Sequence, residues 1–168
     1  MNSIAKSWLA TSVFALAGVV SALFYAIVSP FLLPHFIIYI VLVVNTFFSI
    51  RFWSALQPKD ARQFLVDAVL VVTYLALAFS IGEPFYFALA ALLLFTVAPL
   101  KYILMRGSTS HEALVEHKIL LDSMGTFACI GLVAGLFLGS PLEVTWLFAI
   151  GFTLANIYLL FIHPMYRL

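Results

Sequence analysis

The chain has 168 residues, of which 65% are apolar and only 9% are charged. Soluble domains carry roughly 25% charged residues. A globular protein of this length also has too little interior to hide so much apolar surface, so the composition excludes an ordinary soluble domain. The formal net charge is +1 and no basic run occurs, so we expect no nucleic-acid partner.

Six apolar runs follow one another along the chain, and none alternates with the period of a strand. Each run has about 20 residues, which at about 1.5 Å per residue matches a hydrocarbon core of about 30 Å. The first run is too long for a signal-peptide core, so we expect a retained helix. The sequence predicts an all-α integral membrane protein with a single transmembrane domain over 1–168. Its spans are predicted near 8–28, 31–50, 63–81, 85–105, 119–138 and 143–162.

The connections between these spans alternate between short and long. Spans 1 and 2, 3 and 4, and 5 and 6 are joined by short Gly, Ser and Pro turns, in which a proline opens the returning helix. The turn prolines are Pro30, Pro84 and Pro141. The loops near 51–62 and 106–118 are longer and hold most of the charge. This pattern predicts three tandem hairpins, each of which crosses the membrane and returns.

All eight Lys and Arg residues fall at one face of this arrangement, whereas the opposite loops hold only Glu83 and Glu143. Basic loops remain on the cytoplasmic side of a membrane. We therefore expect both termini in the cytoplasm, and the plasma or inner membrane as the location if the chain is bacterial.

The three hairpins also share a register when they are aligned on their turn prolines. Fifteen residues after each proline come Asn45, Pro99 and Asn156, and Asp67 and Asp122 precede their prolines by 17 and 19 residues. This register favours a tandem threefold repeat about an axis along the membrane normal. The alternative is that any six-span chain with tight turns looks periodic.

Five residues of this register form a candidate polar cluster within the membrane, because polar and ionisable groups in apolar helices usually face a bundle interior or a wet cavity. They are Asn45, Asp67, Pro99, Asp122 and Asn156. An acid at this depth suits proton- or cation-coupled transport, and Pro99 frees a backbone carbonyl. The alternative is structural anchoring, with the aspartates paired to Arg62 or Lys118.

Two sets of small residues at four-residue spacing are predicted helix-packing sites, because another helix can lie closely on such a stripe. The sets are Gly18, Ala22 and Ala26 in the first span, and Gly131, Gly135 and Gly139 in the fifth. They serve either packing within one chain or contact with a second copy or another membrane protein.

Three histidines near the basic face are weak metal candidates: His111, His117 and His163. The segment 111–117 lacks the spacing of zinc-protease motifs, and on a helix its side chains do not converge on one ion. A solvated, amphipathic lead-in to the fifth span is the alternative, and haem ligation by His117 and His163 is a third reading. We predict no cofactor.

No nucleophile or carboxylate pair suggests an enzyme. The sequence favours a small membrane transporter or channel-like protein for a small solute or ion, as an oligomer in the lipid bilayer. The first alternative is a non-catalytic subunit or assembly factor of a larger membrane complex, and the second is a membrane-embedded enzyme or haem protein. No motif places the chain in a family.

Overall fold

The computed structural model describes residues 2–57, 60–107 and 111–166, and within them every regular element is helical. The elements are α1 (Ser3–Tyr25), α2 (Leu32–Trp53), α3 (Ala61–Phe79), α4 (Pro84–Ile103), α5 (Glu112–Phe137), α6 (Pro141–Ile157) and a terminal π turn, η1 (Tyr158–Ile162). Six helices are long and apolar enough to cross a membrane, α6 together with η1 counting as one. The prediction of six such helices and no strand is therefore confirmed for this part of the chain.

Two helices begin five or more residues before their apolar runs. Helix α1 begins at Ser3, because the Asn2 side chain accepts a hydrogen bond from the Ala5 amide at 2.8 Å and so caps the first turn. Helix α5 begins at Glu112 instead of near residue 119, so its charged lead-in is helical. Both helices therefore extend past their apolar stretch into residues that include charged side chains, which hydropathy alone does not detect.

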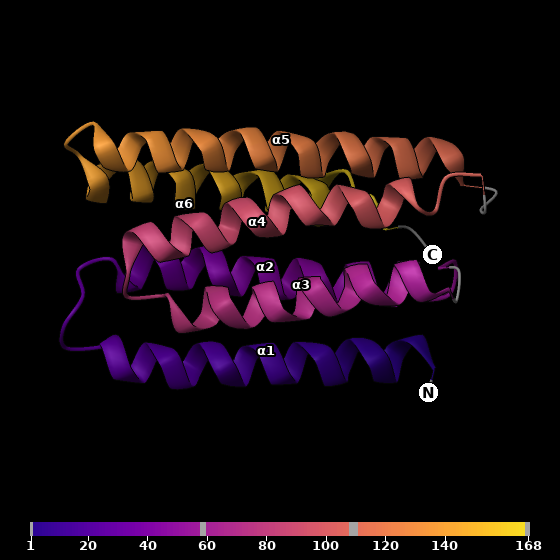
Figure 1. Ribbon diagram of the computed structural model, residues 1–168, viewed down its shortest axis with the longest axis horizontal. Coiled ribbons are helices and arrows are strands. Elements are labelled where there is room, and N and C mark those ends of the chain that lie inside the picture. The colour runs from indigo at the N-terminus through magenta and orange to yellow at the C-terminus, as the bar shows by residue number, and fades with distance from the viewer. Residues whose placement is uncertain (1, 58–59, 108–110, 167–168) are drawn as a thin grey trace.

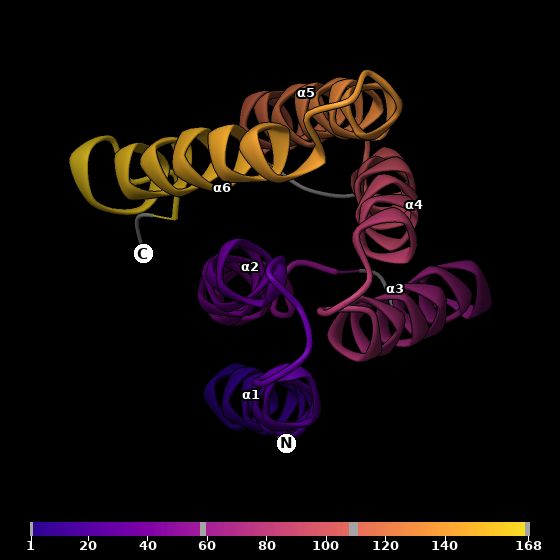
Figure 2. The same ribbon diagram turned by 90° about the vertical axis from the view of Figure 1, so that its left-hand side faces the viewer.

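The main helix contacts close a ring in the order α1, α2, α6, α5, α4, α3 and back to α1. Figure 2 shows this ring end-on, with α5 and α6 opposite α1. A threefold axis along the membrane normal would instead repeat one contact between successive hairpins, for example α2 with α3, α4 with α5, and α6 with α1. The main contacts include only α4 with α5 from this set. The ring order therefore does not match the threefold arrangement that the sequence register favoured.

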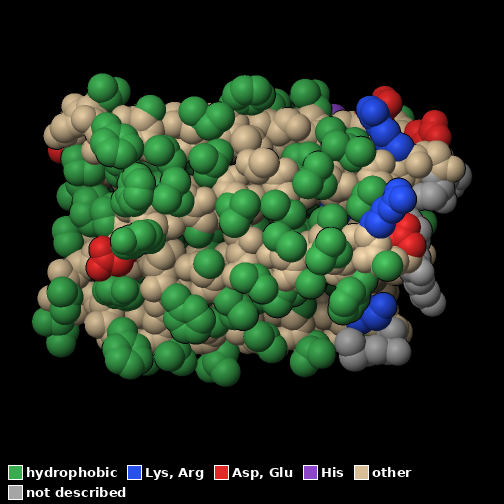
Figure 3. All heavy atoms as spheres, viewed as in Figure 1, with side chains coloured by type: hydrophobic (Ala, Val, Ile, Leu, Met, Phe, Trp, Pro, Cys, Tyr) green, Lys and Arg blue, Asp and Glu red, His purple; other side chains and the backbone are tan. Residues whose placement is uncertain are grey.

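Both termini lie at the same end of the bundle (Figure 1). Figure 3 shows apolar side chains over the middle of one face, while Lys and Arg side chains gather at the end that carries the termini. We call this end the basic end. Lys59 and Arg167, two of the eight basic residues, lie outside the described residues.

The interior of the ring differs between its two ends. Away from the basic end it is filled by apolar side chains that are buried completely, including Ile38, Tyr39, Leu77, Ile81 and Phe87. A smaller buried cluster around Trp53, Tyr102 and Met105 lies at the basic end. A cavity is lined by residues of both regions, including Phe14 and Phe95 of the first and Tyr102 of the second.

Candidate functional site

A cavity of about 590 Å³ lies inside the ring, lined by residues of α1 to α5. Lys6 and Asp60 belong to its wall and are exposed, so the cavity reaches the surface at the basic end. Its wall extends along α3 as far as Tyr74, roughly 20 Å from the start of that helix at about 1.5 Å per residue. The cavity therefore passes the middle of the bundle and remains closed at the other end.

The inner end of the cavity is an aromatic floor. The rings of Phe14 and Tyr74 stack with centroids 4.6 Å apart. Tyr39 donates a hydrogen bond from its hydroxyl to the Phe14 carbonyl at 2.8 Å, which ties α2 to α1. A Cβ at Gly18 would collide with the Tyr39 ring, so this close approach requires glycine. The predicted packing role of Gly18 thus has a specific partner within the chain.

The structure brings three residues of the candidate polar cluster to this cavity and places a fourth in contact with one of them. Asn45, Asp67 and Asp122 line it. Asn156 is buried and accepts a 2.8 Å hydrogen bond from the Asn45 amide, which joins α2 to α6. The fifth residue, Pro99, is buried in α4 and is not part of the wall.

Pro99 nevertheless shapes the wall through the carbonyl that it leaves without an intrahelical donor. Proline has no N–H, so the carbonyl four residues earlier, that of Phe95, lacks its helical hydrogen bond. The Thr126 hydroxyl of α5 donates to this carbonyl at 2.7 Å. Phe95 lines the cavity, so the free carbonyl predicted from Pro99 links α4 to α5 beside the site.

The deepest charges in the cavity are Lys118 and Asp122, one turn apart on α5. Their side chains are each 8% exposed and form a hydrogen-bonded ion pair. The Lys118 amino group also lies 5.4 Å from the centroid of the Tyr102 ring. The second carboxylate oxygen of Asp122 is buried and has no hydrogen-bond partner within the described part of the chain. The ion pair named as the structural alternative is thus present, with one acceptor unused.

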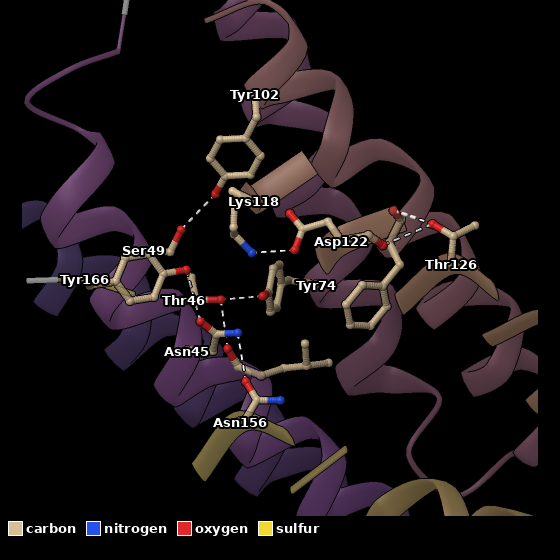
Figure 4. Close-up of polar contacts among 12 residues, drawn as sticks. Asn45, Thr46, Ser49, Tyr74, Tyr102, Lys118, Asp122, Thr126, Asn156 and Tyr166 are labelled. Atoms are coloured by element: carbon tan, nitrogen blue, oxygen red, sulfur yellow. Dashed lines mark hydrogen bonds and ion pairs between the residues drawn. The ribbon is translucent and has the colours of Figure 1, made fainter. Parts of the chain in front are cut away.

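Hydroxyl and amide groups surround this ion pair in Figure 4. Ser49 and Tyr102 share a hydrogen bond of 3.0 Å, and the hydroxyls of Thr46 and Tyr74 are hydrogen-bonded to each other. Tyr166 donates to the Asn45 side-chain oxygen at 3.3 Å. Burial raises the pKa of Tyr166 above its ordinary value, so its phenol remains a donor.

Sequence reasoning missed these hydroxyl groups, since Ser, Thr and Tyr are common in membrane helices. One signal was available: Asn45 and Ser49 are four residues apart and so share a face of α2.

A second ion pair lies nearer the mouth of the cavity. Lys101 of α4 reaches Asp67 of α3 at 2.8 Å, and the Gln57 amide also donates to Asp67. The Asp67 side chain is 36% exposed. Arg62, the predicted partner of Asp67, is exposed instead, because the adjacent helix places Lys101 closer.

The small residues of α5 have different surroundings. Gly135 is buried, and a Cβ there would lie 2.5 Å from a Val144 methyl group of α6. Gly131 is exposed and has open space where a Cβ would be. Gly139 lies in the turn after α5 with a φ of +94°, which favours glycine for its backbone conformation. Of these three glycines, only Gly135 has a close contact with another helix among the described residues.

Three further small residues complete this comparison. In α1, Ala22 is half-buried, and Ala26 is exposed beyond the end of the helix. Sequence reasoning missed Gly125, where a Cβ would collide with the Phe95 ring of α4. Gly125 lies outside the four-residue stripe, so spacing could not identify it.

The histidines divide between the two ends. His111, His117 and His163 are all exposed near the basic end. Among the described residues, no three His, Cys, Asp or Glu side chains lie close enough to hold a metal ion. His35 is buried at the far end, where its Nδ1 lies 2.7 Å from the Ile81 carbonyl and its ring stacks on Phe87.

The chain matches no model of a known protein family, and it has no match among curated proteins or solved structures.

Proposed function

We propose that this protein is a small membrane carrier that holds a polar solute in the cavity and exposes it to one side of the membrane at a time. The observation that supports the proposal most is the contrast between the two ends of the ring. An open cavity with buried polar groups reaches the basic end. The far end is filled by side chains such as Ile38 and Leu77, which are not exposed at all. A channel would need a path through both ends, whereas a carrier opens them in turn.

The basic end faces the cytoplasm in this proposal, because basic loops remain on that side. The cavity is then open to the cytoplasm, and the three hairpins of the sequence run outward and back. Reporter fusions test this orientation at five positions. Cytoplasmic signals are expected for fusions after Trp53, Arg106 and Leu168, and external signals for fusions near Glu83 and Gly139. One reversed position would overturn the orientation.

Thiol labelling from each side of the membrane tests the carrier cycle. The single cysteine, Cys129, is first replaced by alanine. Leu70 lines the cavity, and Leu77, two turns later on the same face of α3, is fully buried beyond its floor. In reconstituted vesicles, an impermeant thiol reagent should label Leu70→Cys from the basic side. It should label Leu77→Cys more slowly, and only from the opposite side.

The two other outcomes have distinct meanings. Labelling of both positions from both sides would indicate a continuous channel. Labelling of Leu70→Cys alone, with Leu77→Cys unreactive from either side, would indicate a rigid bundle and contradict the carrier.

A non-catalytic subunit of a membrane complex is the second candidate. The exposed Gly131 and Gly151 favour it, since open space at these positions leaves room for the close approach of another helix. The two candidates differ in what the protein needs for function. A carrier works in vesicles that contain this chain alone, whereas a subunit purifies with a partner and has no activity without it.

A further inference from the structure

The cavity is larger than a bare ion requires. Its volume is about 590 Å³, whereas one water molecule occupies roughly 30 Å³ of liquid. Pockets for small organic molecules measure about 300–1,000 Å³ and are mostly apolar with a few placed polar groups. The wall fits this description, since Phe14, Leu70 and Phe95 line it together with the polar residues. An organic solute is therefore the better match.

The charges of the wall are balanced. Three lysines and three aspartates line the cavity: Lys6, Lys101, Lys118, Asp60, Asp67 and Asp122. A ligand with one net charge would therefore meet three side chains of the opposite charge and three of its own charge. The net charge of these six residues therefore favours neither an anion nor a cation.

The deep ion pair offers one contact to each sign of charge. The ammonium group of Lys118 has three protons to donate: one is directed at Asp122 and a second at the Tyr166 hydroxyl, so a third remains for a ligand. The second oxygen of Asp122 is an acceptor without a partner in the described residues. Asp122 lines the cavity, and a partial rotation about the last bond of its side chain would turn this buried oxygen toward the cavity.

Breaking a buried ion pair leaves a charge without compensation, which is strongly unfavourable. A ligand that carries both an ammonium and a carboxylate group avoids this penalty. Its ammonium would donate to the free oxygen of Asp122 while its carboxylate accepts from Lys118, so that every charge keeps an opposite neighbour.

We infer that the cavity binds a zwitterion of the amino-acid type, with its charged groups on Lys118 and Asp122 and its apolar side chain on the aromatic floor. This inference rests on the proposed function, because it names the solute class of the same cavity. The floor of Phe14 and Tyr74 and the neighbouring Phe95 favour a large apolar side chain, aromatic or branched.

Calorimetric binding to the purified full-length protein in detergent tests the inference without any substitution. The compounds are L-phenylalanine, phenethylamine, which lacks the carboxylate, and 3-phenylpropionate, which lacks the ammonium. L-phenylalanine should bind about tenfold or more tightly than either analogue, since each lost group removes a charged hydrogen bond. Glycine, which lacks the apolar part, should bind more weakly. Equal binding of an analogue, or no binding of L-phenylalanine, L-leucine or L-tryptophan, would overturn the inference.

Two variants locate the binding. Asp122→Asn should weaken L-phenylalanine and reduce its advantage over 3-phenylpropionate, because the ammonium loses its ionic partner. Glu116→Gln makes the same chemical change on the same helix at a side chain that is 65% exposed and outside the cavity, so it should leave binding unchanged. Equal effects of the two changes would overturn the assignment to Asp122.

The binding and labelling experiments can fail independently. Alternating access without zwitterion binding leaves a carrier with another solute class, and zwitterion binding without alternating access leaves a binding protein that does not transport.

Discussion

The contribution of the hydrogen bond from Thr126 to the Phe95 carbonyl can be tested together with Pro99, because this proline leaves the carbonyl without a donor in its own helix. Thr126→Val keeps the shape of the side chain and removes the hydroxyl, so the carbonyl freed by Pro99 loses its donor. Hydrogen bonds between membrane helices contribute about 0.6 kcal/mol on average and up to about 1.7 kcal/mol. A buried acceptor without a partner costs about 1–3 kcal/mol. We expect the free energy of unfolding to fall by about 1–2 kcal/mol.

The same change should cost much less in a Pro99→Ala background. Alanine restores a backbone N–H, which can donate to the Phe95 carbonyl within α4. Thr126→Val should then lower the free energy of unfolding by less than about 0.5 kcal/mol, which gives a coupling of about 1 kcal/mol in the double-mutant cycle.

Reversible unfolding in mixed micelles measures all four proteins of the cycle. Thr96→Val is a matched control, because the exposed Thr96 hydroxyl donates only to the Leu92 carbonyl of its own helix. It should be nearly neutral. A loss for Thr126→Val that is the same with and without Pro99 would refute the reasoning, since the carbonyl would then not depend on the hydroxyl.

Three further predictions concern other contacts. Gly135→Leu should lower the melting temperature in detergent because even a Cβ there meets α6, whereas Gly131→Leu should not change it unless the chain is oligomeric. His35→Ala removes a hydrogen bond and a ring stack at the closed end, so labelling of Leu77→Cys from the far side should become faster. Asp67→Asn removes a partly exposed ion pair, so it should lower the free energy of unfolding by less than about 1 kcal/mol, and added salt should reduce this loss.

The helices could be predicted from the sequence because their length and apolar composition answer directly to the thickness of a bilayer. Which helices lie next to each other in the bundle could not be predicted from the sequence. Membrane helices such as α2 and α4 are apolar on every side, so no amphipathic stripe identifies the face that turns inward. The depth of Asn45 and Asn156 followed from their spacing to the turn prolines, but their contact depends on the adjacency of α2 and α6, which lie far apart in sequence.

The sequence also predicted only some of the side-chain contacts. Lys118 and Asp122 are one turn apart on one helix, so their ion pair could be named in advance. The partner of Asp67 could not, because Lys101 comes from another helix and its approach depends on how α3 and α4 are rotated against each other. Gly125 is similar: its contact with Phe95 exists only once α4 and α5 are packed.

The closed aromatic floor also determines where a membrane potential acts on this molecule. In the proposed carrier, water that entered the cavity from the basic end would carry the potential of that side down to Phe14 and Tyr74, and the voltage would fall mainly across the packed side chains beyond them. One elementary charge that crosses 100 mV changes in energy by about 2.3 kcal/mol. Lys118 and Asp122 lie on the cavity side of the floor and together carry no net charge, and the proposed zwitterion would carry none past the floor. Transport of such a solute should therefore be electrically silent, driven by its concentration gradient and indifferent to the voltage across the membrane.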